Sequence, residues 1–385
     1  MPWLVWGLGA SLFFSQYLGR IAPGIMVPEL TAAFQVTALS LGTLSAFFYL
    51  AYVSLQLPVG MLVDRYGPRL LLPLMGGLYV VGCVTFAQAN QLGYAETGRF
   101  LMGLGAAFTF VSTLKLATNW FPASRIGLLA GFTQSIGMLG AAVGRAPVSY
   151  AVSSLGWRET MLGIAVICFI IVSLIIWIVR DHPPRAQRVS TLAKAPPHPV
   201  SVNMLTSLRT VLRNPQTWIN ALFLGLLYAP TAAFAELWGV VYLSKTYSLS
   251  NHEAAFGVGL MFIGWGIAGP FAGWFSDYLK KRRCVMLGSA LSGTILMLCI
   301  LYLPGLPVWC IYILLFLFGV SNTGVAVAYA LSSEINARSV AGTSIAFANM
   351  SSVLIGAASQ PLIGALLDIF QNFSLALSLL PLCLA

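Results

Sequence analysis

Five ionisable residues interrupt otherwise apolar stretches of this sequence, and their chemistry is the first guide to what the protein does. They are four basic residues and one acid, namely Arg20, Arg99, Lys115, Arg145 and Glu236. Burying a charge in an apolar medium costs about 3 kcal/mol even on lenient insertion scales, so such residues mark functional sites by default. A guanidinium can hold a carboxylate through two parallel hydrogen bonds, and a buried carboxyl can gain and lose a proton. The set predicts anion binding combined with proton exchange.

Arg20 is the strongest candidate for the anion ligand. Gln16, Arg20 and Gly24 follow helical spacing and share one face, with Tyr17 beside them. If Pro28 marks the end of the first apolar helix, Arg20 lies roughly 12 Å from that end, at about 1.5 Å per residue. We expect Gln16, Tyr17 and Arg20 to contact the substrate. The alternative is an arginine paired with a carbonyl or reaching outward to the lipid head groups.

Arg145 offers a second cation for the same cavity. Gln134 lies eleven residues earlier, which places the two roughly 20° apart around a continuous helix. We expect both to contact an anionic substrate, although Arg145 could instead reach the lipid head groups. A second cation would deepen an anion-attracting cavity.

Glu236 is the only acid well inside an apolar stretch, and it follows the small residues Gly225, Ala229 and Ala232 at helical spacing. We expect it to carry the coupling proton; a static ion pair is the alternative. The three histidines, His182, His198 and His252, fall in predicted loops, which leaves no histidine relay.

Polar residues also recur in the C-terminal half, where Asn322 and Tyr329 share one predicted helix face and Asn349, Ser352 and Gln360 share another. Asn322, Tyr329 and Asn349 are predicted to form hydrogen bonds with hydroxyl or amide groups of the substrate. Polar contacts between helices are the alternative for each of them.

The elements that must hold these residues are membrane-spanning helices. Of the 385 residues, 58% are hydrophobic and 8% are charged, against about 25% charged in soluble proteins. This composition excludes a soluble enzyme and a disordered chain, and it predicts an all-α polytopic membrane protein in contact with the lipid bilayer. Pro, Gly and charged clusters divide it into twelve expected helices, near residues 3–25, 41–62, 70–89, 95–118, 127–150, 159–180, 216–243, 254–275, 284–303, 307–331, 340–366 and 373–385.

The polar stretch 181–215 separates two sets of six predicted helices, which gives a bundle over 1–180, a linker over 181–215 and a bundle over 216–385. Basic residues gather in alternate loops, which predicts cytoplasmic termini and a bacterial inner membrane. Their scatter over loops argues against nucleic acid. The cysteines stand singly and the sequence has no phosphate-binding GxxxxGK[ST] loop, so we expect no metal, no cofactor and no ATP drive.

An internal repeat relates the two predicted bundles. Gly60 and Asp64 form a G-x3-D pattern that Gly273 and Asp277 repeat 213 residues later. The same offset carries Arg125 onto Arg338. Two related halves in parallel orientation place a substrate site between them, near the middle of the membrane.

The run GMLVDRYGPR, over residues 60–69, resembles the G-x-L-x-D-R-x-G-R-[RK] signature of the major facilitator superfamily, and RFLMGLGAA over 99–107 resembles its helix-4 pattern. The resemblance covers essentially the whole chain and implies two pseudo-symmetric six-helix bundles, a monomer and a conformational or proton-cycle role for Arg99. It also implies latches at the cytoplasmic end of the bundles. We assign these latches to Gly60, Asp64, Arg65, Arg69, Arg125, Asp277 and Arg338.

Within that superfamily, YLGRIAPGIMVPEL over residues 17–30 looks like the anion:cation symporter branch, in which the helix-1 arginine contacts the anion. The resemblance implies secondary active transport of a small carboxylate-type anion, with proton symport and rocker-switch alternating access. Transport of an amino acid or a carboxylate siderophore, and a non-transporting sensor, stay as alternatives. Proton-driven drug efflux is disfavoured because Arg145 replaces the proline of the antiporter signature. The sequence shows no cluster typical of an enzyme active site.

Overall fold

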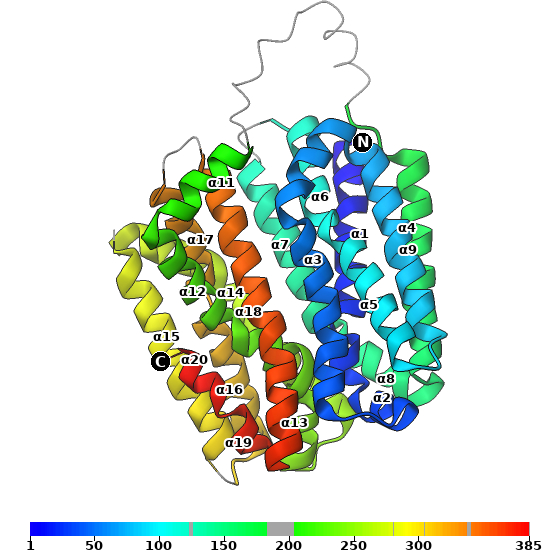
Figure 1. The fold of residues 1–385 in the computed structure, drawn as a ribbon, viewed down its shortest axis with the longest axis vertical. Coiled ribbons are helices and arrows are strands. Elements are labelled where there is room, and N and C mark those ends of the chain that lie inside the picture. The colour runs from blue at the N-terminus through cyan, green and yellow to red at the C-terminus, as the bar shows by residue number, and fades with distance from the viewer. Residues whose placement is uncertain (123–125, 183–203, 280, 304, 337–339, 385) are drawn as a thin grey trace, which may run out of the picture.

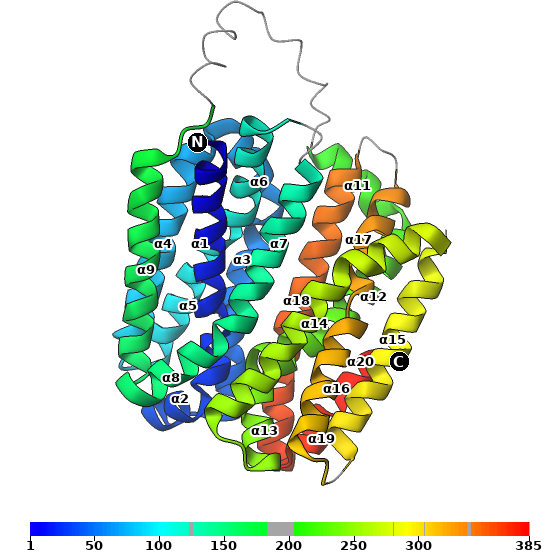
Figure 2. The same ribbon diagram turned by 180° about the vertical axis from the view of Figure 1, so that it is seen from behind.

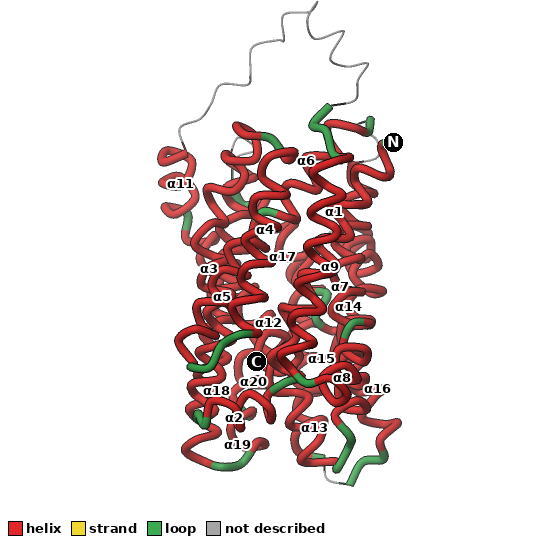
Figure 3. Tube along the Cα trace, turned by 90° about the vertical axis from the view of Figure 1, so that its right-hand side faces the viewer, coloured by secondary structure: helices red, strands yellow, loops and turns green. Residues whose placement is uncertain are grey.

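The computed structural model describes residues 1–122, 126–182, 204–279, 281–303, 305–336 and 340–384. Every regular element within these ranges is a helix, as the red tube in Figure 3 shows. The first group comprises α1 (Pro2–Ile25), α2 (Val27–Phe34), α3 (Ala38–Tyr66), α4 (Pro68–Ala87), α5 (Leu92–Ala107), α6 (Thr109–Trp120), α7 (Ile126–Val143), α8 (Arg145–Leu155) and α9 (Trp157–Ile178). The second comprises α11 (Met204–Arg213), α12 (Pro215–Pro230), η2 (Thr231–Trp238), α13 (Gly239–Tyr247), α14 (Asn251–Leu279), α15 (Arg282–Tyr302), α16 (Val308–Ser321), α17 (Gly324–Glu334), α18 (Ala341–Phe370), α19 (Phe373–Leu377) and α20 (Leu379–Leu384).

The predicted all-helical architecture is confirmed, and each of the twelve expected segments overlaps helices of the structure. Within the described residues, eight helical stretches are long and apolar enough to cross a membrane. Several expected helices are broken in two: at Phe108 between α5 and α6, at Gly144 between α7 and α8, and at Asn322 and Thr323 between α16 and α17. Apolar periodicity does not report these breaks, because both parts of each helix stay apolar.

Local sequence signals explain where several helices begin and end. Gly67 (φ 78°) separates α3 from α4, and Gly156 (φ 96°) separates α8 from α9, at backbone angles that only glycine adopts without strain. Pro68 occupies the first turn of α4, where its missing N–H costs nothing. The Thr37 side chain accepts a hydrogen bond from the Ser40 N–H and caps α3.

The helices form two groups that lie side by side, α1 to α9 on the right of Figure 1 and α12 to α20 on the left, and reversed in Figure 2. Between the groups, α3 packs along α18, α7 packs against α14, and α1 packs against η2 and α13. The chain therefore has the two-bundle fold that its sequence predicts. The proposed boundaries at residues 180 and 215 stay a prediction.

The two groups join firmly at the end that carries α2 and α13, at the bottom of Figure 1, which we call the α13 end. The Asp368 carboxylate of α18 accepts hydrogen bonds from the N–H groups of Ala38 (3.0 Å) and Leu39 (2.9 Å), which open α3. The Asn251 amide donates to the Ile25 carbonyl oxygen (3.2 Å). A Cβ atom on Gly364 would strike the Ala38 backbone, so this contact requires glycine. We call the opposite end, at the top of Figure 1, the α11 end.

Candidate functional site

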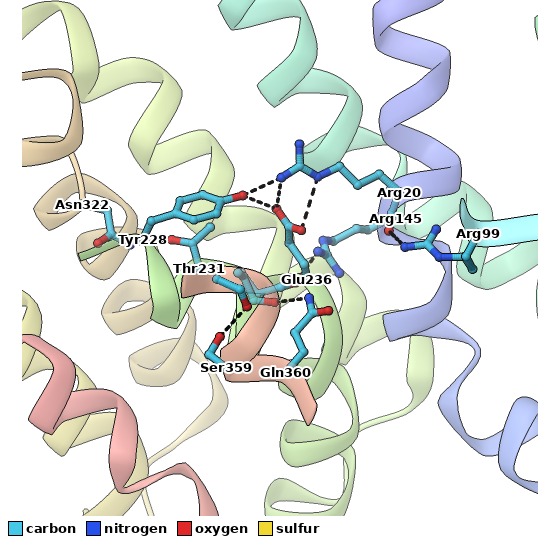
Figure 4. A network of polar contacts seen from close by, with 12 residues as sticks. Arg20, Arg99, Arg145, Tyr228, Thr231, Glu236, Asn322, Ser359 and Gln360 are labelled. Atoms are coloured by element: carbon cyan, nitrogen blue, oxygen red, sulfur yellow. Dashed lines mark hydrogen bonds and ion pairs between the residues drawn. The ribbon is translucent and has the colours of Figure 1, made fainter. Parts of the chain in front are cut away.

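Arg20 and Glu236, which the sequence predicts as separate functional residues, form an ion pair between the two groups of helices. The Arg20 Nη2 atom lies 3.1 Å from Glu236 Oε1, and Nε lies 3.4 Å from Oε2. The guanidinium therefore holds both carboxylate oxygens through its edge, as Figure 4 shows. The side chains are 12% and 2% exposed, so the pair is nearly cut off from solvent. An ion pair this buried depends on each partner, because removal of one leaves an uncompensated charge.

The Tyr228 hydroxyl closes the pair into a triangle. It accepts a hydrogen bond from Arg20 Nη2 (2.5 Å) and donates one to Glu236 Oε1 (3.0 Å). Tyr228 belongs to α12, one element before the segment that carries Glu236. Tyr228 is not among the residues that the sequence predicts for the site.

Aromatic rings surround the Arg20 guanidinium on its other sides. Its Cζ atom lies 5.1 Å from the Tyr17 ring centre, 4.9 Å from that of Tyr49 and 6.0 Å from that of Phe48. These distances allow cation–π attraction. Tyr17 is a predicted site residue, whereas Phe48 and Tyr49 of α3 are not predicted from the sequence and are found at the site in the structure.

Two buried polar groups near Arg20 have no hydrogen-bond partner. Gln16, one turn before Arg20 on α1, is 3% exposed, and both of its amide atoms are unpartnered. The Tyr49 hydroxyl is buried and unpartnered as well. Buried polar groups are almost always bonded, so unpartnered ones beside a cation are groups that a ligand could satisfy.

Glu236 stands in a π-helical segment, η2, where the sequence predicts one continuous α-helix over 216–243. A π-helix bonds each N–H to the carbonyl five residues earlier, and short π segments are frequent at functional sites. Pro230, directly before η2, has no N–H to continue the α-helical pattern. A Cβ on Gly24 would strike the Glu236 backbone, so glycine permits the close approach of α1 to η2.

Side chains from outside the helix bind the carbonyl oxygens of this region. Gln360 donates to Ala232 (2.8 Å), Ser359 to Ala229 (3.5 Å) and Arg145 to Ala235, as Figure 4 shows. Gln360 and Ser359 come from α18 in the second group, whereas Arg145 comes from α8 in the first. Both groups of helices therefore hold the segment that presents Glu236.

Arg145 is fully buried, and its guanidinium lies over the Phe262 ring at 5.1 Å. Apart from the bond to Ala235, its Nε and Nη1 atoms have no partner. Gln134, predicted to share its face, is exposed on α7, and the break at Gly144 separates the two. The structure thus brings Arg145 to η2, and it does not bring Gln134 there.

Arg99 fixes the backbone of α1 beside Arg20. Its Nη1 donates to the Gly19 carbonyl oxygen (2.9 Å) and its Nη2 to that of Arg20 (3.5 Å). The guanidinium is fully buried and lies 4.8 Å from the Phe48 ring centre. Any movement of Arg99 would therefore be transmitted to the main chain at Arg20.

The predicted polar residues of the second half divide between two places. Asn322 donates to the Thr231 hydroxyl of η2 (2.9 Å), and its own amide oxygen has no partner. The Tyr329 hydroxyl donates to Asn349 (2.7 Å), and Asn349 donates to Gln56 of α3 (2.9 Å). The second set forms a polar contact between the groups.

The predicted latch residues fall at the α11 end, and the structure describes them in part. Arg125 and Arg338 lie outside the described residues, as do the side chains of Asp64 on α3 and Asp277 on α14. Gly60 lies on α3, and the Arg65 guanidinium lies 5.3 Å from the Tyr66 ring centre. The backbone N–H of Arg69 donates to Asp181 (2.8 Å). Asp181 was not predicted, and it caps the first turn of α4.

A family model and several known proteins match the sequence of this chain. The model of the Major Facilitator Superfamily matches residues 9–361. The chain is 24% identical, over 49% of its length, to a protein named as a probable sulfoacetate transporter of Cupriavidus necator, and 26% identical, over 70%, to one named as a probable L-galactonate transporter of Escherichia coli. The matches span 44% and 61% of those relatives, so the chain covers less than two thirds of each.

A solved structure shares the fold. The crystal structure of a bacterial homolog of the human lysosomal transporter Spinster, inward-facing and unoccupied, superposes with a TM-score of 0.78 at 14% identity, covering 96% of this chain and 83% of that one.

Proposed function

The chain belongs to the Major Facilitator Superfamily, and on this premise we propose that it is a multi-pass membrane protein that transports a small organic anion by secondary active transport. The relatives are named for acids, sulfoacetate and L-galactonate, which supports an anionic substrate. The family assignment favours transport over catalysis, in keeping with the sequence. The coupling ion in this proposal is the proton.

The observation that carries the proposal is the buried pair of Arg20 and Glu236 between the two groups of helices. A substrate carboxylate can take the place of the Glu236 carboxylate on the Arg20 edge, because both present the same two oxygens. The Glu236 carboxylate thus occupies the position beside Arg20 that the substrate carboxylate is proposed to take. Binding of substrate and ionisation of Glu236 compete for one guanidinium.

This competition gives a route to proton coupling. When Glu236 takes a proton, its attraction to Arg20 falls and the guanidinium is free for substrate. When substrate occupies Arg20, the displaced Glu236 is left in a buried site, where a carboxyl favours its neutral form. Proton and anion therefore bind together, which is the condition for symport.

The remaining site residues take roles that match their contacts. Gln16 and the Tyr49 hydroxyl, both buried and unpartnered, bind the body of the substrate. Arg99 holds the α1 backbone during the cycle. Gln134, Asn322, Tyr329 and Asn349 stay proposed substrate contacts.

Orientation and gating complete the proposal. The α3–α4 connection, with Arg65 and Arg69, lies at the α11 end, and the α8–α9 connection, with Arg158, lies at the α13 end. Because basic residues are in excess in the loops at the α11 end, this end, where Figure 1 marks the N-terminus, is proposed to face the cytoplasm of a bacterial cell. That both termini are cytoplasmic stays a prediction. The contacts of the α13 end would open when the latches around Asp64 and Asp277 form at the α11 end. The protein works as a monomer in this scheme.

A transport assay with an Arg20→Lys variant tests the proposal. Purified protein in proteoliposomes is given labelled L-galactonate or sulfoacetate, with and without an inward proton gradient. Lysine keeps the charge and loses the planar edge, so we expect the affinity to fall about tenfold or more. The control is Arg158→Lys, because the Arg158 guanidinium is likewise held by a hydrogen bond, in its case to the Ala89 carbonyl oxygen (2.8 Å), and lies away from the site. Unchanged affinity in Arg20→Lys would reject Arg20 as the ligand.

A further inference from the structure

The buried charges around the site do not balance. Among the residues that the structure describes, Arg99 and Arg145 are fully buried and Arg20 is 12% exposed, whereas Glu236 supplies the buried negative charge. Three buried guanidinium groups are therefore accompanied by one buried carboxylate, which pairs with Arg20 alone. Buried charges without a counterion are costly, so an excess of two positive charges is a strong attraction for a ligand.

The three arginines differ in how far the protein satisfies them. Arg20 is held by Glu236 and Tyr228, and Arg99 donates two hydrogen bonds to the α1 backbone. Arg145 donates to the Ala235 carbonyl, while its Nε and Nη1 atoms are buried without a partner. Arg145 is therefore the cation with the most unused binding capacity.

Arg145 and Arg20 approach adjacent residues of the same segment. Arg20 binds the Glu236 side chain and Arg145 binds the Ala235 carbonyl. Figure 4 shows both guanidinium groups directed at η2 around Glu236. The Phe262 ring lies 5.1 Å from the Arg145 Cζ atom, and the Nε and Nη1 atoms of the guanidinium are buried without a hydrogen-bond partner. A ligand with two acidic groups could reach both cations.

We propose that the substrate is a dianion, a small diacid whose first acidic group binds Arg20 and whose second binds the unpartnered edge of Arg145. This inference rests on the proposed function and narrows its substrate class from organic anions to acids with two acidic groups. With Glu236 displaced and protonated, the two negative charges of the ligand replace its single charge beside these cations. The second group also satisfies nitrogen atoms that the protein leaves unpaired.

Matched pairs of acids that differ only in the second carboxylate test this inference. The pairs are D-glucarate with D-gluconate, succinate with butyrate, and phthalate with benzoate. Binding to the purified protein is measured by isothermal titration calorimetry and transport by counterflow in proteoliposomes. We expect the diacid of at least one pair to bind about tenfold or more tightly than its monoacid, as a charge-assisted hydrogen bond would produce.

The Arg145→Gln variant assigns that preference to a residue. Glutamine can still donate a hydrogen bond to the Ala235 carbonyl, while the charge is removed. We expect the affinity for the preferred diacid to fall about tenfold and that for the monoacid to change less than about twofold. Arg158→Gln is the matched control, because Arg158 also donates to a carbonyl and lies over a ring, that of Trp157, at 4.1 Å. It should leave both affinities unchanged.

The outcomes separate this inference from the proposed function. Equal binding of monoacids and diacids by the unmodified protein would overturn the dianion inference and leave anion transport standing. An equal loss for both acids in Arg145→Gln would also overturn it, and would make Arg145 a positioning residue for η2. Failure of every acid to bind or exchange would reject the anion transporter itself, and the inference with it.

Discussion

At the scale of single residues, the Tyr228 hydroxyl decides how tightly Glu236 and Arg20 hold each other, because it bonds to both. A Tyr228→Phe variant keeps the ring and removes a hydrogen bond that favours ionised Glu236. We expect the pH profile of transport to shift towards alkaline values and the free energy of unfolding to fall by about 1–3 kcal/mol. Proton-driven uptake at a series of pH values and thermal unfolding in detergent measure the two effects.

Tyr242→Phe is the control for this residue. Its hydroxyl donates to the Ile300 carbonyl oxygen (2.9 Å), so the variant loses a buried hydrogen bond of similar kind away from the site. It should lose stability and keep the pH profile of the unmodified protein. Identical pH profiles for the two variants would exclude Tyr228 from the coupling site.

At the scale of the elements, closure of the α13 end depends on Asp368 of α18 capping α3. Two backbone N–H groups at a helix start stabilise a carboxylate by about 0.5–2 kcal/mol. We expect Asp368→Asn to move the equilibrium several-fold towards an open α13 end. Spin labels at the exposed residues Gln35 and Gln371, at the ends of α2 and α18, would report a larger population of long distances.

The matched control for this cap is Glu334→Gln. Glu334 pairs with Arg282 (2.8 Å) on the same group of helices, so its loss removes a carboxylate without touching the junction. It should leave the label distances unchanged. A distance distribution that is the same in Asp368→Asn as in the unmodified protein would exclude the cap as a closing contact.

At the scale of the whole molecule, the Arg20–Glu236 ion pair links the two groups of helices within the part of the chain that the structure describes, beside hydrogen bonds such as that of Asn349 to Gln56. Arg20 belongs to α1 and Glu236 to η2, so an exchange of Glu236 for substrate removes an ion pair from the interface between the groups. In the proposed mechanism, the two groups rearrange only after Arg20 has been paired again or Glu236 has been neutralised. The proposal therefore makes alternating access depend on the occupancy of the site.

The helical two-bundle fold can be predicted from the sequence, because the length of the apolar stretches, the small number of charged residues and the repeated G-x3-D motif all indicate it. Arg20 and Glu236 can be singled out from the sequence as well, because a charge in an apolar helix is costly and therefore marks a functional site. Their contact cannot be predicted, because 216 residues separate them and the repeat does not say which faces meet. The contact between Tyr228 and Glu236 cannot be predicted from the sequence either, because it depends on the π-helical turns of η2. Residues eight apart point about 80° apart on an α-helix, and a π turn changes that angle.

The central claim is that substrate displaces Glu236 from Arg20 and that the displaced carboxyl takes a proton. Proton uptake on substrate binding measures it directly, with purified protein in weakly buffered detergent solution and a saturating acid identified by the binding assays. The account predicts uptake of about one proton per protein near neutral pH, and none in Glu236→Gln. Substrate binding with no proton uptake in the unmodified protein, or with equal uptake in Glu236→Gln, would contradict it.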